Sequence, residues 1–223
     1  LDISNNNIQN SGIRYSIYGK PSMTEGGYIF SGLSYILSWL GVVDSENDKY
    51  DELGKISPII FTDNSYHISD AAILDPVNIT SMKDALIKYG ALTVFVNGAN
   101  PNNAFYNNDT KASYCNNQSL GNHFVTVVGW DDNFSRDNFK INPGHDGAWI
   151  CKNSWGTDWG DEGIVYISYY DKTFLPGGFF EDDAFGIVIE NTIPYNKNYQ
   201  HDFIWSGQFA GFDENGVLAP GIN

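Results

Sequence analysis

Residues 149–160 read WICKNSWGTDWG, and this short stretch says more about the fold than any other part of the chain. Its first half belongs to an apolar and aromatic run that predicts a strand over 148–153. Its second half, with glycines among polar residues, predicts a turn. Taken alone, an asparagine that leaves a strand into such a turn is an ordinary loop anchor. The two tryptophans, Trp155 and Trp159, could equally close a hydrophobic core.

A second informative stretch lies upstream, where residues 121–130 read GNHFVTVVGW. Its β-branched run predicts a strand over 123–130 that begins at His123. A lone histidine at the start of an apolar strand is usually structural, or it is satisfied by a neighbour. Similar short runs bounded by Gly, Asn and Asp predict further strands over 92–96, 164–169 and 185–189.

Two helices are predicted before these strands. Apolar residues at the three-and-four spacing of one helical face predict a helix over 27–40. A shorter helix is expected to begin near Thr80 or Ser81, because Ser81 and Asp84 have capping-box spacing. It is expected to end at Gly90. Helices followed by an antiparallel sheet indicate the α+β class.

The composition narrows the classes of function. The chain has 223 residues, with 27 acidic and 12 basic side chains and a formal net charge of -15. This charge argues against nucleic acid and anionic membranes as partners, because both require local positive charge. The acidic run 44–52 is interpreted as a solvated loop. No stretch reaches the roughly 18 apolar residues that span a bilayer, so no membrane insertion is expected.

Together, NHFVTVVGW and AWICKNSWGTDWGDEGIVYIS closely resemble the His and Asn region of the papain-like cysteine peptidases. The string KNSWGTDWG is the most specific part, because several uncommon residues occur in a fixed order. The resemblance implies that His123 is the general acid/base, that Asn153 orients it, and that Trp155 shields their hydrogen bond. This fits the chemistry, because a thiolate nucleophile needs an imidazole partner, and that imidazole needs an acceptor on its other nitrogen.

The resemblance also implies a fold and parts of a substrate cleft. The expected fold has two lobes, one helical and one an antiparallel β lobe. Gly26 and Gly27 would form a turn whose backbone binds the peptide substrate, since glycine lets another backbone approach closely. Asn122 and Phe124 would flank His123 in the cleft. Alternatively, Asn122 is an ordinary loop residue and Phe124 an aromatic residue of the core.

The chain departs from the family pattern at the nucleophile. Nothing in residues 1–25 resembles the family's Cys-Gly-Ser-Cys-Trp segment. Aligning Gly27 with the nucleophile would leave too short an interval to His123, so we reject that alignment. Cys115 and Cys151 are interpreted as buried or half-buried free thiols. We therefore expect the N-terminal catalytic helix, with the Cys, on an upstream segment or separate chain of the same gene product.

The resemblance therefore implies a cysteine-type endopeptidase that acts on peptide or protein substrates, similar to the secreted or surface peptidases of bacteria and archaea. Its location would be extracellular or at the cell surface. Residues 1–190 would form the peptidase domain, and residues 191–223 a C-terminal extension or the start of a further, lectin-like module. No cofactor and no metal are expected. Three acidic residues, Asp131, Asp132 and Asp137, suggest a calcium site. Their spacing is not that of an EF-hand loop, so a solvated turn is the preferred interpretation.

Two alternatives stay open at this point. The missing Cys also fits a catalytically inactive papain-like fold that serves as a surface binding or scaffold protein. The aromatic-rich tail from Pro194 onward also fits a carbohydrate- or wall-binding protein in which the peptidase fold is a relic.

Overall fold

The computed structural model describes residues 3–4, 7–8, 32, 35–36, 42–49, 66–98, 104–118, 121–174 and 184–190. The chain divides into two compact units. One consists of Leu1–Ser69 with Ile189–Asn223, and the other of Asp70–Val188. The second unit contains the one long described helix and most of the described strands.

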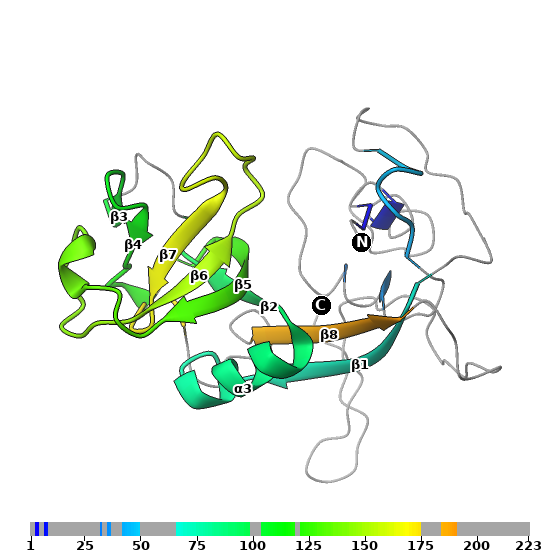
Figure 1. Ribbon diagram of the computed structural model, residues 1–223, viewed down its shortest axis with the longest axis horizontal. Helices are drawn as coiled ribbons and strands as arrows, with labels where there is room; N and C mark the ends of the chain where they lie inside the picture. Colours follow the sequence, from blue (N-terminus) through cyan, green and yellow to red (C-terminus); the bar gives the residue numbers. More distant parts are fainter. Residues whose placement is uncertain are drawn as a thin grey trace, which may run out of the picture. The chain divides into compact units, whose positions relative to one another are not determined.

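The named strands of the described structure form one eight-stranded mixed sheet (Figure 1). Its spatial order is β1-β8-β2-β5-β6-β7-β4-β3. The central pairs β2–β5, β5–β6 and β6–β7 are antiparallel, whereas β4 pairs with β7 in parallel. The strands are β1 (His67–Leu74), β2 (Leu92–Val96), β3 (Tyr106–Asn107), β4 (Ala112–Ser113), β5 (His123–Asp131), β6 (Ala148–Lys152), β7 (Ile164–Ser168) and β8 (Ala184–Glu190).

The main core lies where helix α3 (Ile79–Tyr89) packs on the central strands. Burial alternates along β2, whose first, third and fifth residues are buried while the other two are half-buried. Fully burying one such aliphatic side chain contributes about 1.5–3 kcal/mol to folding. A one-residue slip of β2 would turn its buried face outward, so burial fixes the register on which the site depends. The helix and strand residues of this core include Met82, Leu86, Leu92, Val94, Val96, Val125, Val127, Trp149, Val165 and Ile167.

Helix α3 begins earlier than the sequence indicated. Its N-cap is Asn78, whose side-chain oxygen accepts a hydrogen bond from the backbone N–H of Ser81 at 3.0 Å. The helix itself starts at Ile79, close to the predicted start near Thr80 or Ser81. The predicted capping box of Ser81 and Asp84 was wrong, because Ser81 lies inside the first turn and its N–H is a group that needs a capping partner. The predicted end was correct. Gly90 follows the last turn with a positive φ of 80°, and its N–H donates to the carbonyl of Leu86.

The predicted strands agree with the structure, and the differences lie at their ends. Strand β2 has the expected bounds, while β5, β6, β7 and β8 differ from them by one residue at one or both ends. Three strands were missed. β3 and β4 have two residues each, too short for any periodicity, and β1 reads HISDAAIL, which lacks a regular alternation. The parallel β4–β7 pair also makes the sheet mixed rather than purely antiparallel.

The first unit is described over shorter segments. Gly32, Tyr35 and Ile36 are helical, and the rest of the predicted helix over 27–40 lies outside the described residues. The acidic run was predicted to be solvated, and at Asp48 this was wrong. Asp48 is buried, and its carboxylate accepts a hydrogen bond from Asn7 Nδ2 at 3.3 Å. A buried acid of this kind is tolerated because it is hydrogen-bonded.

Candidate active site

The sheet brings His123 and Asn153 together. His123 is the first residue of β5, and Asn153 directly follows the last residue of β6. Strands β5 and β6 run antiparallel with Thr126 opposite Lys152, so the start of one strand faces the segment that leaves the other. His123 Nε2 lies 2.9 Å from Asn153 Oδ1. Two residues far apart in the sequence thus meet in one hydrogen bond.

The direction of this hydrogen bond follows from a neighbouring contact. The backbone N–H of Ser154 donates to the same Oδ1 atom at 2.7 Å, so that atom must be the acceptor of the Asn153 side chain. The imidazole therefore donates from Nε2, and Nδ1 is the nitrogen that remains for proton transfer. Asn153 is 6% exposed, and its own N–H donates to the carbonyl of Gly163 at 2.9 Å. Hydrogen bonds thus hold both the main chain and the side chain of Asn153 in place.

The turn after Asn153 is held by glycines and backbone hydrogen bonds. Gly156 and Gly160 have positive φ values of 84° and 68°. A Cβ on Gly160 would lie 2.4 Å from the carbonyl oxygen of Ile164, so no other residue fits there without a backbone shift. The N–H of Gly163 donates to the carbonyl of Trp159 at 2.7 Å and closes the turn.

Trp155 lies against the imidazole. The ring centroids of His123 and Trp155 are 4.9 Å apart, with an interplanar angle of 33°. Trp155 is 40% exposed, so part of the residue faces solvent although its ring contacts the histidine. Trp159 meets Trp155 edge-on at 4.8 Å. The sequence indicated Trp155, but this contact of Trp159 was not foreseen, although the spacing of the two tryptophans was visible.

The neighbours of His123 in the chain have different surroundings. Asn122 is exposed, and its Oδ1 accepts a hydrogen bond from the N–H of Gly98 at 2.7 Å. Phe124 is half-buried and packs on Phe95 of β2, with ring centroids 4.9 Å apart. Asn122 thus connects the start of β5 to the end of β2, and Phe124 takes part in packing between the two strands. Their predicted substrate contacts stay a prediction.

The other predicted substrate-binding residues are Gly26 and Gly27, and both lie outside the described residues. Their contact with a peptide backbone likewise stays a prediction.

Both cysteines are buried free thiols, as predicted. Burial raises the pKa of Cys151, which lies within β6, and the negative charge of Asp171 raises it further. Burial also raises the pKa of Cys115, whose Sγ donates to the carbonyl of Asn117 at 3.3 Å. A buried thiol with a raised pKa is a poor nucleophile. Neither cysteine matches the requirements of a catalytic thiolate.

The three acids considered for calcium make contacts within the protein. Asp131 accepts from the N–H of Asn133, and Asp137 from Asn142 Nδ2 at 3.0 Å. Asp132 pairs with Lys83, and this hydrogen bond lowers the pKa of its carboxyl. Within the described ranges, no group of three or more His, Cys, Asp or Glu residues is arranged to hold a metal ion.

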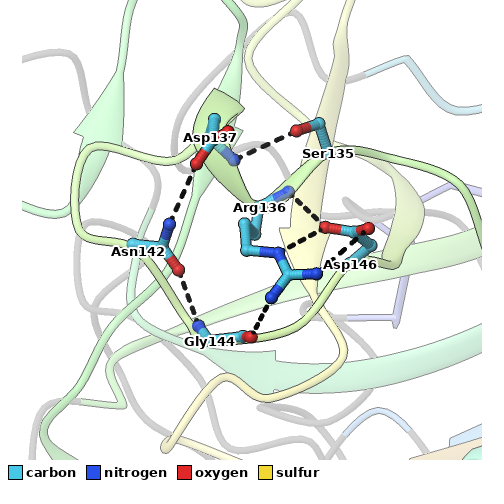
Figure 2. Close-up of polar contacts among 6 residues, drawn as sticks. All are labelled: Ser135, Arg136, Asp137, Asn142, Gly144 and Asp146. Atoms are coloured by element: carbon cyan, nitrogen blue, oxygen red, sulfur yellow. Dashed lines mark hydrogen bonds and ion pairs between the residues drawn. The ribbon is translucent and has the colours of Figure 1, made fainter.

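The loop that joins β5 to β6 is braced by polar side chains (Figure 2). Arg136 donates from Nε to Asp146 Oδ1 at 2.8 Å and from a terminal nitrogen to the carbonyl of Gly144. Asn142 bridges Asp137 and the N–H of Gly144. Arg136 lowers the pKa of Asp146 by hydrogen bonding to it. This loop closes the hairpin whose open end carries His123 and Asn153.

Comparison with known proteins identifies the class to which this fold and site belong. A family model described as papain family cysteine protease matches residues 18–174, which is most of the chain. The chain belongs to the papain family of cysteine proteases.

Two solved structures and two curated relatives illustrate the similarity. The clostridial cysteine protease Cwp84 after propeptide cleavage has a TM-score of 0.76 and 26% identity, covering 94% of this chain and 52% of that one. A structure of the protease and lectin-like domains of Cwp84, a surface layer associated protein of Clostridium difficile, has a TM-score of 0.75, 26% identity, and coverage of 91% and 45%. Chicken (Gallus gallus) cathepsin K is 27% identical over 64% of this chain and 40% of its own length. Macrodontain-1 of Ananas macrodontes is 25% identical over 64% of this chain and 60% of its own length.

The chain thus spans only about half of the proteins that it matches. The papain-like fold expected from the sequence is confirmed by these neighbours. Among the described residues, no helix is long and apolar enough to cross a membrane.

Proposed function

We propose that this chain supplies the acid/base pair of a cysteine-type endopeptidase that hydrolyses peptide bonds. The observation that carries the proposal is the hydrogen bond from His123 Nε2 to Asn153 Oδ1, with the ring of Trp155 against the imidazole, in a chain of the papain family. In this proposal His123 transfers protons, Asn153 orients the imidazole, and Trp155 keeps water from their hydrogen bond. The substrate cleft is proposed to be lined by Asn122, Phe124, Gly26 and Gly27.

The proposed reaction has two halves. A thiolate attacks the carbonyl carbon of the scissile bond, and the imidazolium of His123 gives its proton to the leaving amine as the C–N bond breaks. A thioester remains. Water then attacks the thioester while the neutral imidazole takes one of its protons, the C–S bond breaks, and the carboxylic acid leaves. The second half restores the thiolate and the imidazolium. Throughout, Nε2 donates to Asn153, so Nδ1 is the atom that gives and takes the proton.

The thiolate is proposed to come from a Cys outside this chain, on an upstream segment or a separate chain of the same gene product. The reason is that Cys115 and Cys151 are both buried with raised pKa values. Residues 1–190 are proposed to act as the peptidase portion, with 191–223 as an extension or the start of a further module. Similarity to a surface layer associated protease supports an extracellular or cell-surface location.

The experiment uses the whole protein that contains this chain. Replacing His123→Ala is expected to abolish hydrolysis of an unstructured protein substrate, because no other group would protonate the leaving amine. The matched control is His145→Ala, an exposed histidine of the β5–β6 loop, which should leave hydrolysis unchanged. Full activity of the His123→Ala protein would refute the assignment.

A second candidate function is a catalytically inactive papain-like fold used for surface binding or as a scaffold. It is favoured by the absence of an exposed thiol among the cysteines of this chain. Iodoacetamide labelling of the native whole protein, followed by peptide mapping, separates the two functions. A rapidly labelled Cys outside residues 1–223 together with loss of hydrolysis supports the peptidase, whereas a protein with no reactive thiol supports the binding function.

A further inference from the structure

Tyr106 connects the buried part of the β lobe to the candidate active site. It lies in β3, in a region without a strand or site signal in the sequence. Its ring stacks on Trp159 with centroids 5.5 Å apart and an interplanar angle of 23°. The residue is 2% exposed, and its hydroxyl is buried without a hydrogen-bond partner among the residues that the structure describes. An unpaired buried hydroxyl is unfavourable, so the aromatic ring is what stabilises this position.

The contact continues from Trp159 to the acid/base pair. Trp159 meets Trp155 edge-on at 4.8 Å with an interplanar angle of 83°, and Trp155 lies 4.9 Å from His123. Four aromatic rings therefore form a continuous series that runs from Tyr106 through the two tryptophans to the imidazole. Such offset and edge-to-face arrangements are favourable geometries for aromatic pairs.

The two ends of this series are held differently. Tyr106 is fixed by the sheet, because it pairs with Ser113 of β4, and the next residue, Asn107, donates from Nδ2 to the carbonyl of Asn138 at 2.8 Å. Trp155 is 40% exposed, so solvent surrounds much of its ring. A half-exposed ring is free to rotate into water unless neighbouring groups retain it. Trp159, backed by Tyr106, is a neighbour placed to do so.

We propose that Tyr106 is a positioning residue, whose ring backs Trp159 and so retains Trp155 over the hydrogen bond between His123 and Asn153. Tyr106 touches neither substrate nor the reacting atoms. Its effect is to exclude water that would compete with Asn153 for the Nε2 proton, because hydrogen bonds in a drier site are electrostatically stronger. The inference rests on the proposed peptidase function and extends it to a residue remote from the reacting atoms.

The test compares three variants of the whole protein: Tyr106→Leu, Tyr106→Phe and the control Phe139→Leu. Tyr106→Leu removes the stacked ring and is expected to lower kcat/KM roughly 10- to 100-fold, mainly through kcat, since misplacing a catalytic group has effects of this size. Tyr106→Phe keeps the ring and should retain the parent kcat, because the hydroxyl makes no hydrogen bond within the described part of the chain. Phe139→Leu also removes a buried ring, but from the separate cluster that Phe139 forms with Ala112, Tyr114 and Ala148, and it should leave kcat unchanged.

A second measurement distinguishes positioning from general loss of stability. The His123 Nε2 proton, observed by NMR without substrate, should exchange with water faster in Tyr106→Leu than in Phe139→Leu or Tyr106→Phe. Unchanged exchange in Tyr106→Leu would overturn the inference. If Tyr106→Leu does not fold, Tyr106→Met replaces it, as its flexible side chain fills such gaps. The exchange measurement needs no hydrolysis, so it tests the role of Tyr106 even if the protein proves to be no peptidase.

Discussion

Two connections of the same sheet use different chemistry for different tasks. The outer part of the loop between β5 and β6 is held by exposed polar side chains, with Arg136, Asp146 and Asn142 at its centre (Figure 2). Within the same loop, the rings of Phe134 and Phe139 pack on each other. The turn between β6 and β7 is held by backbone hydrogen bonds, by glycines in the left-handed region, and by packed aromatic rings. The first has only to close a hairpin. The second carries Asn153 and has to fix one amide oxygen within hydrogen-bonding distance of an imidazole.

The difference between the two connections indicates where substitutions should matter. Exposed ion pairs and loop hydrogen bonds contribute little individually, because water and salt compete for the same groups. Where the backbone leaves no space for a Cβ, water and salt cannot relieve the clash, and the backbone itself has to move. We therefore expect matched changes in the two connections to have unequal effects, in stability and in catalysis.

The largest difference is expected from a pair of glycine substitutions. Gly160→Ala places a Cβ 2.4 Å from the carbonyl oxygen of Ile164 at a φ of 68°, and should lower the free energy of unfolding by about 2–4 kcal/mol. Gly144→Ala, in the other connection, also has a positive φ, but apart from its chain neighbours the new Cβ meets no atom of the described residues within 4 Å. It should cost only the left-handed backbone penalty of about 1–2 kcal/mol. Urea unfolding of the whole protein measures both values, and equal losses would contradict the distinction between the two connections.

The next difference is expected from a pair of asparagines. Asn153→Ala removes the acceptor of the His123 Nε2 proton and should lower kcat/KM roughly 100-fold, because the imidazole is no longer oriented. Asn142→Ala removes a bridge between Asp137 and Gly144, and kcat/KM should stay within about twofold of the parent, as for an ordinary surface change. Steady-state kinetics on a peptide substrate provide the measurement. Comparable losses in both variants would show that the β5–β6 loop takes part in positioning the site.

The smallest effect is expected from Arg136→Gln. Arg136 lowers the pKa of Asp146, so the pair is stabilising above the unfolded-state pKa of Asp, which is about 4. The stabilisation is lost as the pH falls through the lowered, folded-state value. The parent and the variant should therefore differ slightly in thermal midpoint near neutral pH and converge in strong acid or high salt. A difference that persists in strong acid would mean that Arg136 acts through packing instead of charge.

The sequence predicted those elements of the fold whose residue pattern extends over several positions. Strands β2 and β5 could be anticipated because runs of β-branched and apolar residues bounded by Gly, Asn and Asp are typical of strands. The capping of α3 could not be anticipated. Asn and Ser are both common at helix N-caps, and only the geometry decides between Asn78 and Ser81. The His123–Asn153 pair came from resemblance to a family, since spacing alone gives no distance between side chains.

Tyr106 marks the limit of such reasoning. It lies in a two-residue strand that shows no periodicity, and its partner Trp159 is far away in the sequence. Only the parallel pairing of β4 with β7 brings the β3–β4 hairpin next to the strand that follows the tryptophan turn. Contacts of this kind depend on the pairing of strands across the whole sheet, so no local sequence pattern predicts them.

Asn153 Oδ1 accepts hydrogen bonds from both His123 and Ser154, and this affects the entropy that each catalytic cycle has to supply. Because Ser154 N–H donates to this oxygen from within the same turn, the amide is oriented when the chain folds. Immobilising a side chain costs about 0.5–1.5 kcal/mol in conformational entropy. Here that entropy is lost once, during folding, and not again whenever a substrate binds. An oriented imidazole is then part of the resting molecule, independent of whether any substrate is present.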